Sequence, residues 1–548
     1  TQVISEPVWE ITTVQNRQRM LIDIFKKQWD LSYTSSGTIN KTPDGDIIYH
    51  ITLRGSKGSG HIHGKVFVVH KGTEISSDTV QSFQKYYSSA YELRNDLIKN
   101  GTIVTAKESY KADVAVNDGK IVAIGSNLDF DADKVVDAGG KLVLPGAIDV
   151  HTHLAMPFGG TVSADSYLAG TRAAACGGVT TVFDYPVQHS GETIMGLINS
   201  KKEVLEKEAC VDYAFHCCIT DLNGGEILDE METAVKEGIT SFKCFFVYKK
   251  EHMMVDDATF VRLLLRAKEL GAKINLHAEN PDLIDMRTEQ FLKEGKTSAW
   301  YHYLSRPEFV EAEADKRAVH WATHLDAPLY IVHMADKEGL EECIKAKTEG
   351  HELYIETCPQ YLEFTCDVYK REDGRNFVCS PPMKGKESQD ALWTAIKSGM
   401  IDTVATDHCP FQSYEKDWGK DDFTKIPNGC AGIENLYPYM LDAANSGKIS
   451  FERAVELCST NPAKIFGCDD KGSIEIGKDA DIVIYDKDKD FTISVNNMHS
   501  DCDHTIWEGK KLHGYPVQTY LRGSLVYDNG DFVGTPGNGK YVKRSTSK

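Results

Sequence analysis

The chain is 548 residues long, with a formal net charge of −20, 41% hydrophobic residues and 26% charged residues. This length is more than one ordinary core supports, and the composition is that of a soluble globular protein, so we expect several domains. The acidic balance argues against nucleic acid and anionic membranes as partners, because both require a basic surface, and no apolar run approaches the roughly 18 residues of a membrane-spanning helix.

The cysteines and the N-terminus bear on the cellular compartment. None of the 14 cysteines forms a CxxC pair, and the adjacent Cys217 and Cys218 would make a strained bridge. Residues 1–5 resemble neither a secretory signal nor a transit peptide. We therefore predict a reduced, cytoplasmic protein.

Residues 1–92 differ in pattern from the rest of the chain, and we expect a small α+β appendage of unassigned role. The regular patterns in it are helical spacing over residues 14–29 and from 77 to about 91, and alternation over 47–51 and 66–69. A histidine pair, His61 and His63, lies in a stretch rich in Gly, Ser and Lys. Because no further candidate ligands accompany this pair, we predict a solvent-exposed loop there.

Short strands with Asn-Gly and Asp-Gly turns begin near residue 93, and a matching β-rich segment returns late in the chain. Between them, strand-like runs alternate with helical stretches, which is the βα rhythm of a barrel. We predict a (β/α)8 TIM-like barrel over residues 147–467. It is inserted in a small β-sandwich that residues 93–146 and 468–548 form together, the latter including a C-terminal tail.

The run from Gly146 to His153 is the most informative stretch of the chain. A β-type segment precedes it, and the alternation of side chains along a strand places His151 and His153 on the same side. Both imidazoles then reach one metal ion at the C-terminal mouth of a parallel barrel, where such enzymes carry their chemistry. An isolated HxH is more often a surface or core pair, so the prediction depends on its companions.

Later segments supply these companions, each at or near the end of a β-like run. They are 239–248 with Lys243, 274–279 with His277, 330–334 with His333, and 404–410 with Asp407 and His408. Taken singly, His277 or His333 is more often a hydrogen-bonded core residue, and His408 is equally a packing residue or an outer partner of the site. Together with the HxH they form a set that chance rarely produces, and they predict a metal centre.

Lys243 is the unusual member, because a cationic amine does not bind zinc and an unpaired buried amine is costly. A neutral lysine reacts with CO2, and the carbamate offers two anionic oxygens that bridge two metals. The predicted centre holds two Zn²⁺ with an open position on each for a bridging hydroxide. Its ligands are His151, His153 and Asp407 on one ion, His277 and His333 on the other, and N6-carboxylated Lys243 on both. The simpler alternative is a lysine that snorkels at a strand end.

On these residues the chain resembles the cyclic amidohydrolases, specifically the dihydropyrimidinase and D-hydantoinase family, over about residues 93–535. The matching motifs are LIKNGT (97–102), HTHLAMPFGGT (151–161), SFKCF (241–245), ETCPQY (356–361), SPP (380–382) and DFTKIPNG (422–429). The resemblance implies a barrel on a small β-sandwich, two zinc ions, a carboxylated lysine and a homotetramer. It places the family's catalytic tyrosine on Tyr248 and its substrate-amide contacts on Ser380 and Asn428.

The chemistry that the resemblance implies is hydrolytic opening of a cyclic amide. The expected substrate is 5,6-dihydrouracil or dihydrothymine, which gives an N-carbamoyl-β-amino acid in reductive pyrimidine catabolism. Tyr248 donates to the developing oxyanion, and Asp407 accepts the hydroxide's proton and returns it to the leaving nitrogen. Met156, Phe158 and Phe245 are candidates for the pocket wall.

Alternatives within and beyond this family stay open. A D-hydantoinase that acts on 5-monosubstituted hydantoins uses the same site. Dihydroorotases and allantoinases resemble the chain too, but the loop after His153 carries neither the arginine of the former nor the acidic, Gly-Arg-containing loop of the latter. This favours a small neutral ring. Non-enzymatic dihydropyrimidinase-like scaffolds have lost metal ligands, whereas all six ligand positions are present here.

Overall fold

The structure is a computed structural model that describes residues 34–41, 47–54, 61–62, 66–69, 95–128 and 132–546. The helices expected at 14–29 and 77–91 lie outside the described residues. The chain divides into two compact units. One unit comprises residues 1–99, 113–118 and 122–137, and the other comprises residues 100–112, 119–121 and 138–548.

The first unit contains strands from the N-terminal part of the chain. They are β1 (Thr34–Lys41), β2 (Ile47–Arg54), β3 (His61–Ile62) and β4 (Val66–Val69), which form one sheet in which β2 pairs with each of the other three. Strands β2 and β4 confirm the two alternating runs. The expected loop around His61 is wrong at this residue, because His61 and Ile62 pair with β2, and β-branched residues such as Ile62 suit a paired strand.

A second four-stranded sheet has the order β10-β5-β8-β9. Its members are β5 (Asn95–Lys99), β8 (Asp113–Asn117), β9 (Lys120–Gly125) and β10 (Lys134–Asp137). Asp118 and Gly119 connect β8 to β9 with φ of 48° and 75°. Positive φ at both central residues is typical of the type I′ hairpin turn that the Asp-Gly pair predicts.

The second unit contains a seven-stranded sheet that joins segments from both ends of the expected barrel. Its order is β26-β25-β24-β23-β11-β6-β7. The members are β6 (Thr102–Val104), β7 (Ser109–Lys111), β11 (Leu142–Pro145), β23 (Ile482–Thr492), β24 (Lys511–Leu521), β25 (Ser524–Asp528) and β26 (Asp531–Phe532). Strand β11 pairs antiparallel with β23, so Val143 lies opposite Ile484. The chain before the barrel and the chain after it therefore share one sheet.

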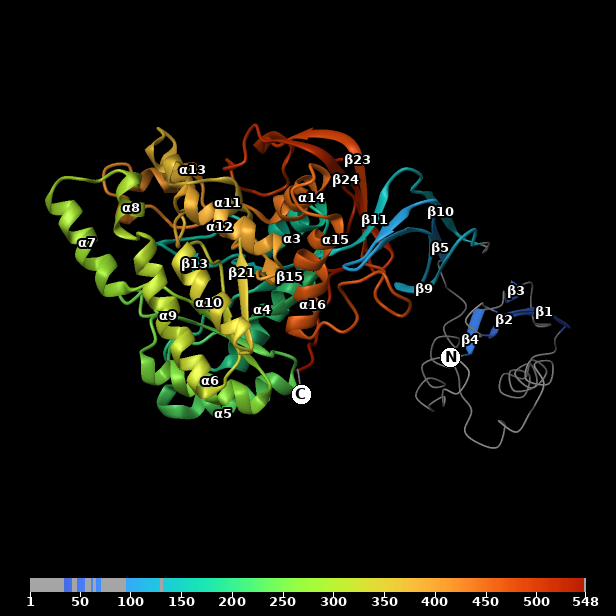
Figure 1. The fold of residues 1–548 in the computed structure, drawn as a ribbon, viewed down its shortest axis with the longest axis horizontal. Helices are drawn as coiled ribbons and strands as arrows, with labels where there is room; N and C mark the ends of the chain where they lie inside the picture. Colours follow the sequence, from blue (N-terminus) through green and yellow to red (C-terminus); the bar gives the residue numbers. More distant parts are fainter. Residues whose placement is uncertain are drawn as a thin grey trace. The chain divides into compact units, whose positions relative to one another are not determined.

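Parallel strands form the barrel of the second unit, as the βα rhythm predicts (Figure 1). They are β12 (Ala147–Thr152), β15 (Val179–Asp184), β16 (Asp212–Phe215) continued by β17 (Cys217–Cys218), β18 (Ser241–Phe245), β19 (Lys273–His277), β20 (Leu329–Ile331), β21 (Leu353–Thr357) and β22 (Thr403–Val404). A parallel bridge between Thr152 and His408 brings the last strand back to the first. The fold is a (β/α)8 barrel, and every residue of strands β12, β15 and β18 is buried, as expected of parallel strands covered on both faces.

Helices follow the barrel strands in chain order and lie outside them in Figure 1. They are α3 (Tyr167–Cys176), α4 (Ile194–Glu208), α5 (Glu226–Lys236), α6 (Asp257–Leu270), α7 (Pro281–Lys293), α8 (Ala299–Ser305), α9 (Glu308–Leu325), α10 (Lys337–Thr348), α11 (Pro359–Glu363), α12 (Lys386–Lys397), α13 (Ser413–Lys416), α14 (Leu436–Asn445), α15 (Phe451–Val455) and α16 (Asn461–Phe466). Helix α6 illustrates how these helices begin and end. The Asp256 side chain accepts the Thr259 N–H at its start, and Gly271, with a left-handed φ of 68°, ends it.

The C-terminal tail reaches the barrel at the N-terminal ends of its strands. Its backbone pairs with Tyr213 at the start of β16, through hydrogen bonds to Lys540 and Val542. Arg544 is only 4% exposed, and its guanidinium donates to the Ser241 hydroxyl at 2.7 Å and lies 5.0 Å from the Phe183 ring. The tail thus closes the end of the barrel opposite the mouth that carries chemistry in this fold.

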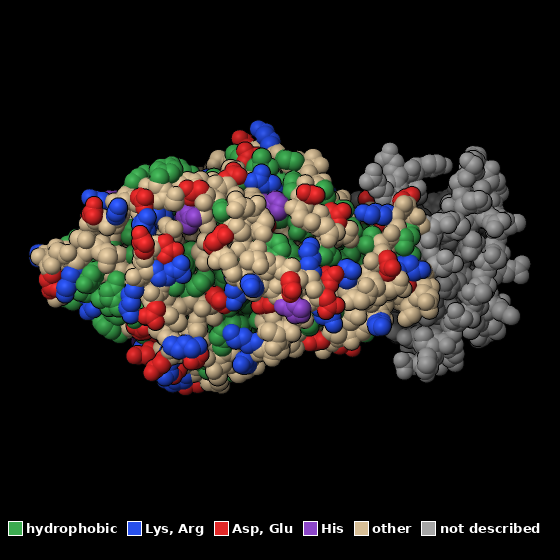
Figure 2. Space-filling model, turned by 90° about the horizontal axis from the view of Figure 1, so that it is seen from above, with side chains coloured by type: hydrophobic (Ala, Val, Ile, Leu, Met, Phe, Trp, Pro, Cys, Tyr) green, Lys and Arg blue, Asp and Glu red, His purple; other side chains and the backbone are tan. Residues whose placement is uncertain are grey.

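The surface shows no separation of charge on the face drawn in Figure 2, where acidic and basic side chains are interspersed. On this face the acidic side chains do not form a single patch. Within the described residues, no helix is long and apolar enough to cross a membrane.

Candidate active site

A pocket opens at the C-terminal ends of the barrel strands, and the predicted site residues converge on it. Its lining consists of His153, Met156, Phe158, Lys243, Phe245, Tyr248, Met253, His277, His333, Ser380, Asp407, Cys409, Asn428 and Gly429. His151 is the one predicted site residue outside this lining, and it lies buried in contact with Lys243 and Asp407. Residues from six different strand ends and loops therefore share one small volume.

The histidine pair and the aspartate form the first group of donors. Asp407 Oδ1 lies 3.2 Å from His151 Nε2 and 3.1 Å from His153 Nε2. Burial raises the pKa of the Asp407 carboxyl, but the adjacent imidazoles, His151 foremost, outweigh burial and hold the pKa well below its usual range. This carboxylate is therefore ionised and faces two imidazole nitrogens, which is a set of ligands that suits zinc.

Lys243 lies buried beside this group. Its Nζ is 2.8 Å from His151 Nε2 and 4.3 Å from the centre of the Tyr185 ring, and the residue is 1% exposed. No carboxylate of the described residues lies within ion-pairing distance of it. Burial lowers the pKa of the Lys243 amine, with Asp407 acting in the opposite direction. The neutral, nucleophilic amine is thereby favoured.

His277 and His333 form the second group. His333 Nε2 lies 3.1 Å from His277 Nδ1, and both residues are buried. Two nitrogens bound to one tetrahedral zinc at 2.0–2.1 Å each lie about 3.3 Å apart, so the observed separation fits a shared metal ion. Burial lowers the pKa of both imidazoles, which keeps them neutral, as metal ligation requires.

Two buried glutamates orient these ligands, and the sequence analysis assigned neither a role. Glu356 Oε1 lies 2.6 Å from His151 Nδ1 and accepts the His333 backbone N–H at 2.9 Å. Burial raises the pKa of Glu356 to about 8. Glu279 Oε2 lies 2.8 Å from His277 Nε2. Such partners fix the ring orientation of metal-binding histidines. A sequence signal exists for both, since Glu356 is the penultimate residue of β21 and Glu279 follows His277 by two residues.

Three site residues have a left-handed backbone that non-glycine residues rarely adopt. The φ angles are 65° at Tyr248, 39° at His333 and 51° at Asp407. Each such conformation costs on the order of 1–3 kcal/mol and persists only where the surroundings impose it. All three residues line one pocket. The placement of their side chains there therefore outweighs the free-energy cost of their backbone conformation.

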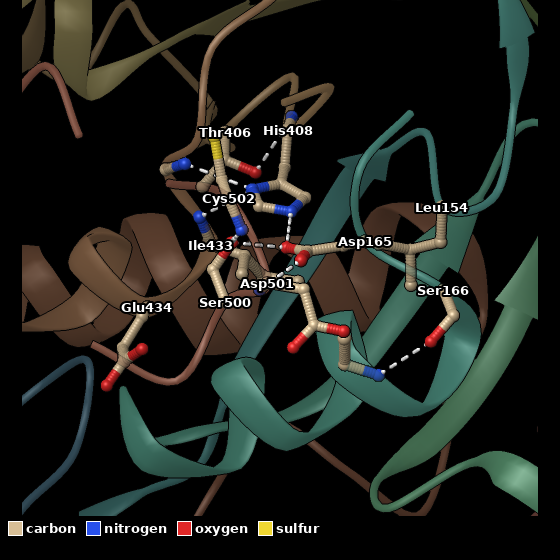
Figure 3. A network of polar contacts seen from close by, with 12 residues as sticks. Leu154, Asp165, Ser166, Thr406, His408, Ile433, Glu434, Ser500, Asp501 and Cys502 are labelled. Atoms are coloured by element: carbon tan, nitrogen blue, oxygen red, sulfur yellow. Dashed lines mark hydrogen bonds and ion pairs between the residues drawn. The ribbon is translucent and has the colours of Figure 1, made fainter. Parts of the chain in front are cut away.

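His408 does not reach the pocket, which answers the question that the sequence left open. Its Nε2 lies 2.8 Å from Asp165 Oδ2, and its Nδ1 accepts the backbone N–H groups of Gly432 and Ile433 (Figure 3). The Ser500 hydroxyl also donates to Asp165, at 2.7 Å. His408 is therefore an outer residue that anchors the loop carrying Asp407.

The remaining predicted residues surround the space beside the candidate metal-binding group, which comprises His151, His153, Lys243, His277, His333 and Asp407. The Tyr248 ring lies 5.3 Å from that of Phe158 and 5.2 Å from that of His277. Burial raises the pKa of the Tyr248 phenol, so it is a neutral hydrogen-bond donor. Asn428 Nδ2 donates to Ser380 Oγ at 3.0 Å, which joins the two residues expected to contact a substrate amide.

Comparison with known proteins identifies the class. The amidohydrolase family matches residues 142–526. D-hydantoinases from Ralstonia pickettii and Geobacillus stearothermophilus are 41% and 42% identical over 457 and 455 residues, which is 82% of this chain and 99% and 96% of theirs. The crystal structure of dihydropyrimidinase from Brevibacillus agri NCHU1002 has a TM-score of 0.81 at 44% identity and covers 82% of this chain and 99% of its own. The chain therefore belongs to the dihydropyrimidinase and D-hydantoinase family of amidohydrolases.

Members of this family are hydrolases that act on cyclic amides, and amidohydrolases generally use a binuclear metal centre. The donor set described above fits such a centre. It offers four imidazoles, one ionised carboxylate and one amine whose pKa burial lowers, all buried or nearly so. Without metal ions, these imidazole nitrogens and carboxylate oxygens would lie close together with few hydrogen-bond donors among them.

Proposed function

We propose that this enzyme opens the ring of 5,6-dihydrouracil or dihydrothymine by hydrolysis and releases an N-carbamoyl-β-amino acid. The observation that carries the proposal is the single pocket on which the metal-binding group, Tyr248, Ser380 and Asn428 converge. The family supplies the reaction class, and the polarity of the pocket supplies the preference among substrates.

The proposed centre contains two Zn²⁺ ions per subunit. The residues that would hold them are His151, His153 and Asp407 for one ion, His277 and His333 for the other, and N6-carboxylated Lys243 for both. The lowered pKa of the buried Lys243 amine, which has no carboxylate within ion-pairing distance among the described residues, supports its reaction with CO2. When bound, the two ions activate a hydroxide and polarise the ring carbonyl.

The protein's own groups then manage protons and charge. Asp407 accepts a proton from the attacking water and returns it to the leaving ring nitrogen. The Tyr248 phenol donates a hydrogen bond to the oxygen on which negative charge develops. Ser380 and the backbone of Asn428 hold the amide edge of the ring, while Met156, Phe158 and Phe245 form an apolar wall.

A neutral substrate suits this lining better than an anionic one. Lys243 is the only lysine or arginine in the lining of the pocket, and its amine is assigned to the metal centre. A carboxylate on the ring would lose hydration and gain no cationic partner. This favours dihydrouracil over dihydroorotate.

The second candidate is hydrolysis of 5-monosubstituted hydantoins, and one feature favours it. A cavity of about 410 Å³ shares Phe158, Tyr248 and Asn428 with the catalytic pocket and extends to Ile284 and Leu292. It offers room for a bulky exocyclic group. A non-enzymatic scaffold is disfavoured, because all six metal-binding positions are present and converge.

We further propose a homotetramer in the cytoplasm. The resemblance to tetrameric family members supports the assembly. All 14 cysteines are unpaired, which supports a reducing compartment.

One assay tests the function. Metal content per subunit is measured together with kcat/KM on dihydrouracil, 5-monosubstituted hydantoins, allantoin and dihydroorotate. We expect two zinc ions and the highest value on dihydrouracil. Higher rates on bulky hydantoins would transfer the assignment to the second candidate, and no activity on any ring would refute both.

A further inference from the structure

Lys416, the last residue of α13, is fully buried, yet the chemistry above does not use it. Its Nζ lies 3.0 Å from the carbonyl oxygen of Val378 and 2.7 Å from those of Pro427 and Gly429. An ammonium has three N–H donors, so these carbonyls engage all of them. No carboxylate lies within ion-pairing distance of this lysine in the described part of the chain. Burial lowers the pKa of the Lys416 amine, whereas the three carbonyl acceptors favour the protonated form, which alone has three N–H donors.

The three carbonyls belong to the two segments that carry the proposed amide contacts. Val378 precedes Ser380 by two residues, and Pro427 and Gly429 flank Asn428. The segments also contact each other directly, because the Gly429 N–H donates to the Val378 carbonyl at 2.9 Å and the Asn428 side chain donates to Ser380. One ammonium therefore lies at the junction of both segments.

Peptide geometry extends the effect of Lys416 to the backbone of Asn428. In a planar trans peptide the N–H points opposite to the C=O. Because the Pro427 carbonyl points to Lys416, the Asn428 N–H points away from it. Because the Gly429 N–H points to Val378, the Asn428 carbonyl points away from that residue.

Both backbone groups of Asn428 are available to a ligand. Among the described residues, neither its N–H nor its carbonyl has a hydrogen-bond partner in the protein. Asn428 lines the catalytic pocket next to Ser380. A free donor and a free acceptor on one residue match the C=O and N–H that lie side by side on the edge of a cyclic amide.

We propose that Lys416 is a positioning residue for the amide edge of the substrate. Its ammonium gathers three carbonyls, fixes the peptides on either side of Asn428, and so presents the Asn428 backbone and the Ser380 hydroxyl to the ring. The proposal rests on the proposed function, since it assumes a cyclic amide substrate. Lys416 itself touches neither the substrate nor the metal-binding group.

The test compares Lys416→Met with the matched control Lys420→Met, which removes an exposed lysine four residues further along the chain. Hydrogen–deuterium exchange is followed in the peptide that contains Gly429, whose amide donates to Val378. Steady-state kinetics are measured on whichever ring the wild-type enzyme opens. Metal content and the midpoint of thermal unfolding are recorded for each variant.

We expect faster exchange at Gly429 in Lys416→Met, a KM raised about tenfold or more, a kcat lowered by a smaller factor, and an unchanged metal content. Lys420→Met should match the wild type in all four readouts. If Lys416→Met does not fold, Lys416→Gln, whose amide keeps two donors, replaces it.

Unchanged exchange or an unchanged KM would overturn the proposal. A kcat that falls as far as KM rises would do the same, because it would indicate general damage to the barrel. If neither variant folds, Lys416 is a stability residue and the proposal is refuted. If the wild-type enzyme opens no ring, the proposed function fails, whereas the exchange measurement still decides whether Lys416 fixes this loop.

Discussion

Replacing Tyr248 by phenylalanine isolates the contribution of one hydroxyl. The ring is held by neighbours on several sides, with ring centres at 5.3 Å for Phe158, 5.8 Å for Phe245 and 5.2 Å for His277. Phenylalanine keeps these contacts. The change therefore removes a hydrogen-bond donor from the pocket with little disturbance of packing.

The expected loss follows from the role of the phenol. Burial raises its pKa, so the hydroxyl stays protonated and donates throughout the neutral range. Removing one oxyanion donor from a buried site costs about 2.7–4 kcal/mol in the transition state, which corresponds to a kcat lowered by about 10²–10³. KM should change little, because the carbonyl oxygen of the bound substrate carries less charge than the developing oxyanion.

The measurement is the initial rate of ring opening, followed by the ultraviolet absorbance of the cyclic amide, together with metal analysis of the same sample. Tyr414→Phe is the control, because Tyr414 is 62% exposed and is not among the residues that line the pocket. A Tyr248→Phe enzyme with kcat within threefold of the wild type would refute the oxyanion role. A variant that loses metal would show that Tyr248 belongs to the metal-binding group.

Three further predictions test other parts of the site. Lys243→Ala should lose both metal and activity, and short-chain carboxylic acids should restore part of each; full activity with two zinc ions retained would end the binuclear model. kcat/KM for dihydrouracil should exceed that for dihydroorotate by about a hundredfold or more, since each unpaired buried polar group costs about 1–3 kcal/mol; equal values would contradict the assignment. Deletion of residues 1–92 should leave a metal-loaded enzyme, and loss of metal from a folded barrel would implicate His61 or His63.

The barrel could be predicted because its signal is local. Strand-like runs alternate with helical stretches along the chain, and this βα rhythm is typical of a parallel barrel. That the candidate metal-binding residues converge could be predicted for a related reason. Strands of a parallel barrel end at the same mouth, so residues far apart in the chain but equally placed on their strands must meet.

Interactions across the barrel could not be predicted in this way. Examples are the contact between Glu356 and His151 and the contact between Asp165 and His408. Such contacts depend on which loops lie side by side and on how far each side chain reaches. Lys416 shows the same limit, because its partners are backbone carbonyls, which have no sequence signature. The sequence predicts a loop at His61 because glycines surround it, whereas in the structure His61 pairs with β2.

The C-terminal tail has a consequence for truncated forms of the protein. Arg544 lies at the base of the barrel and donates to Ser241, on the strand that carries Lys243 two residues later. A variant that ends before Arg544 would leave the Ser241 hydroxyl and the Phe215 carbonyl without this donor. Loss of the tail therefore disturbs the strand of Lys243 from the end opposite the pocket.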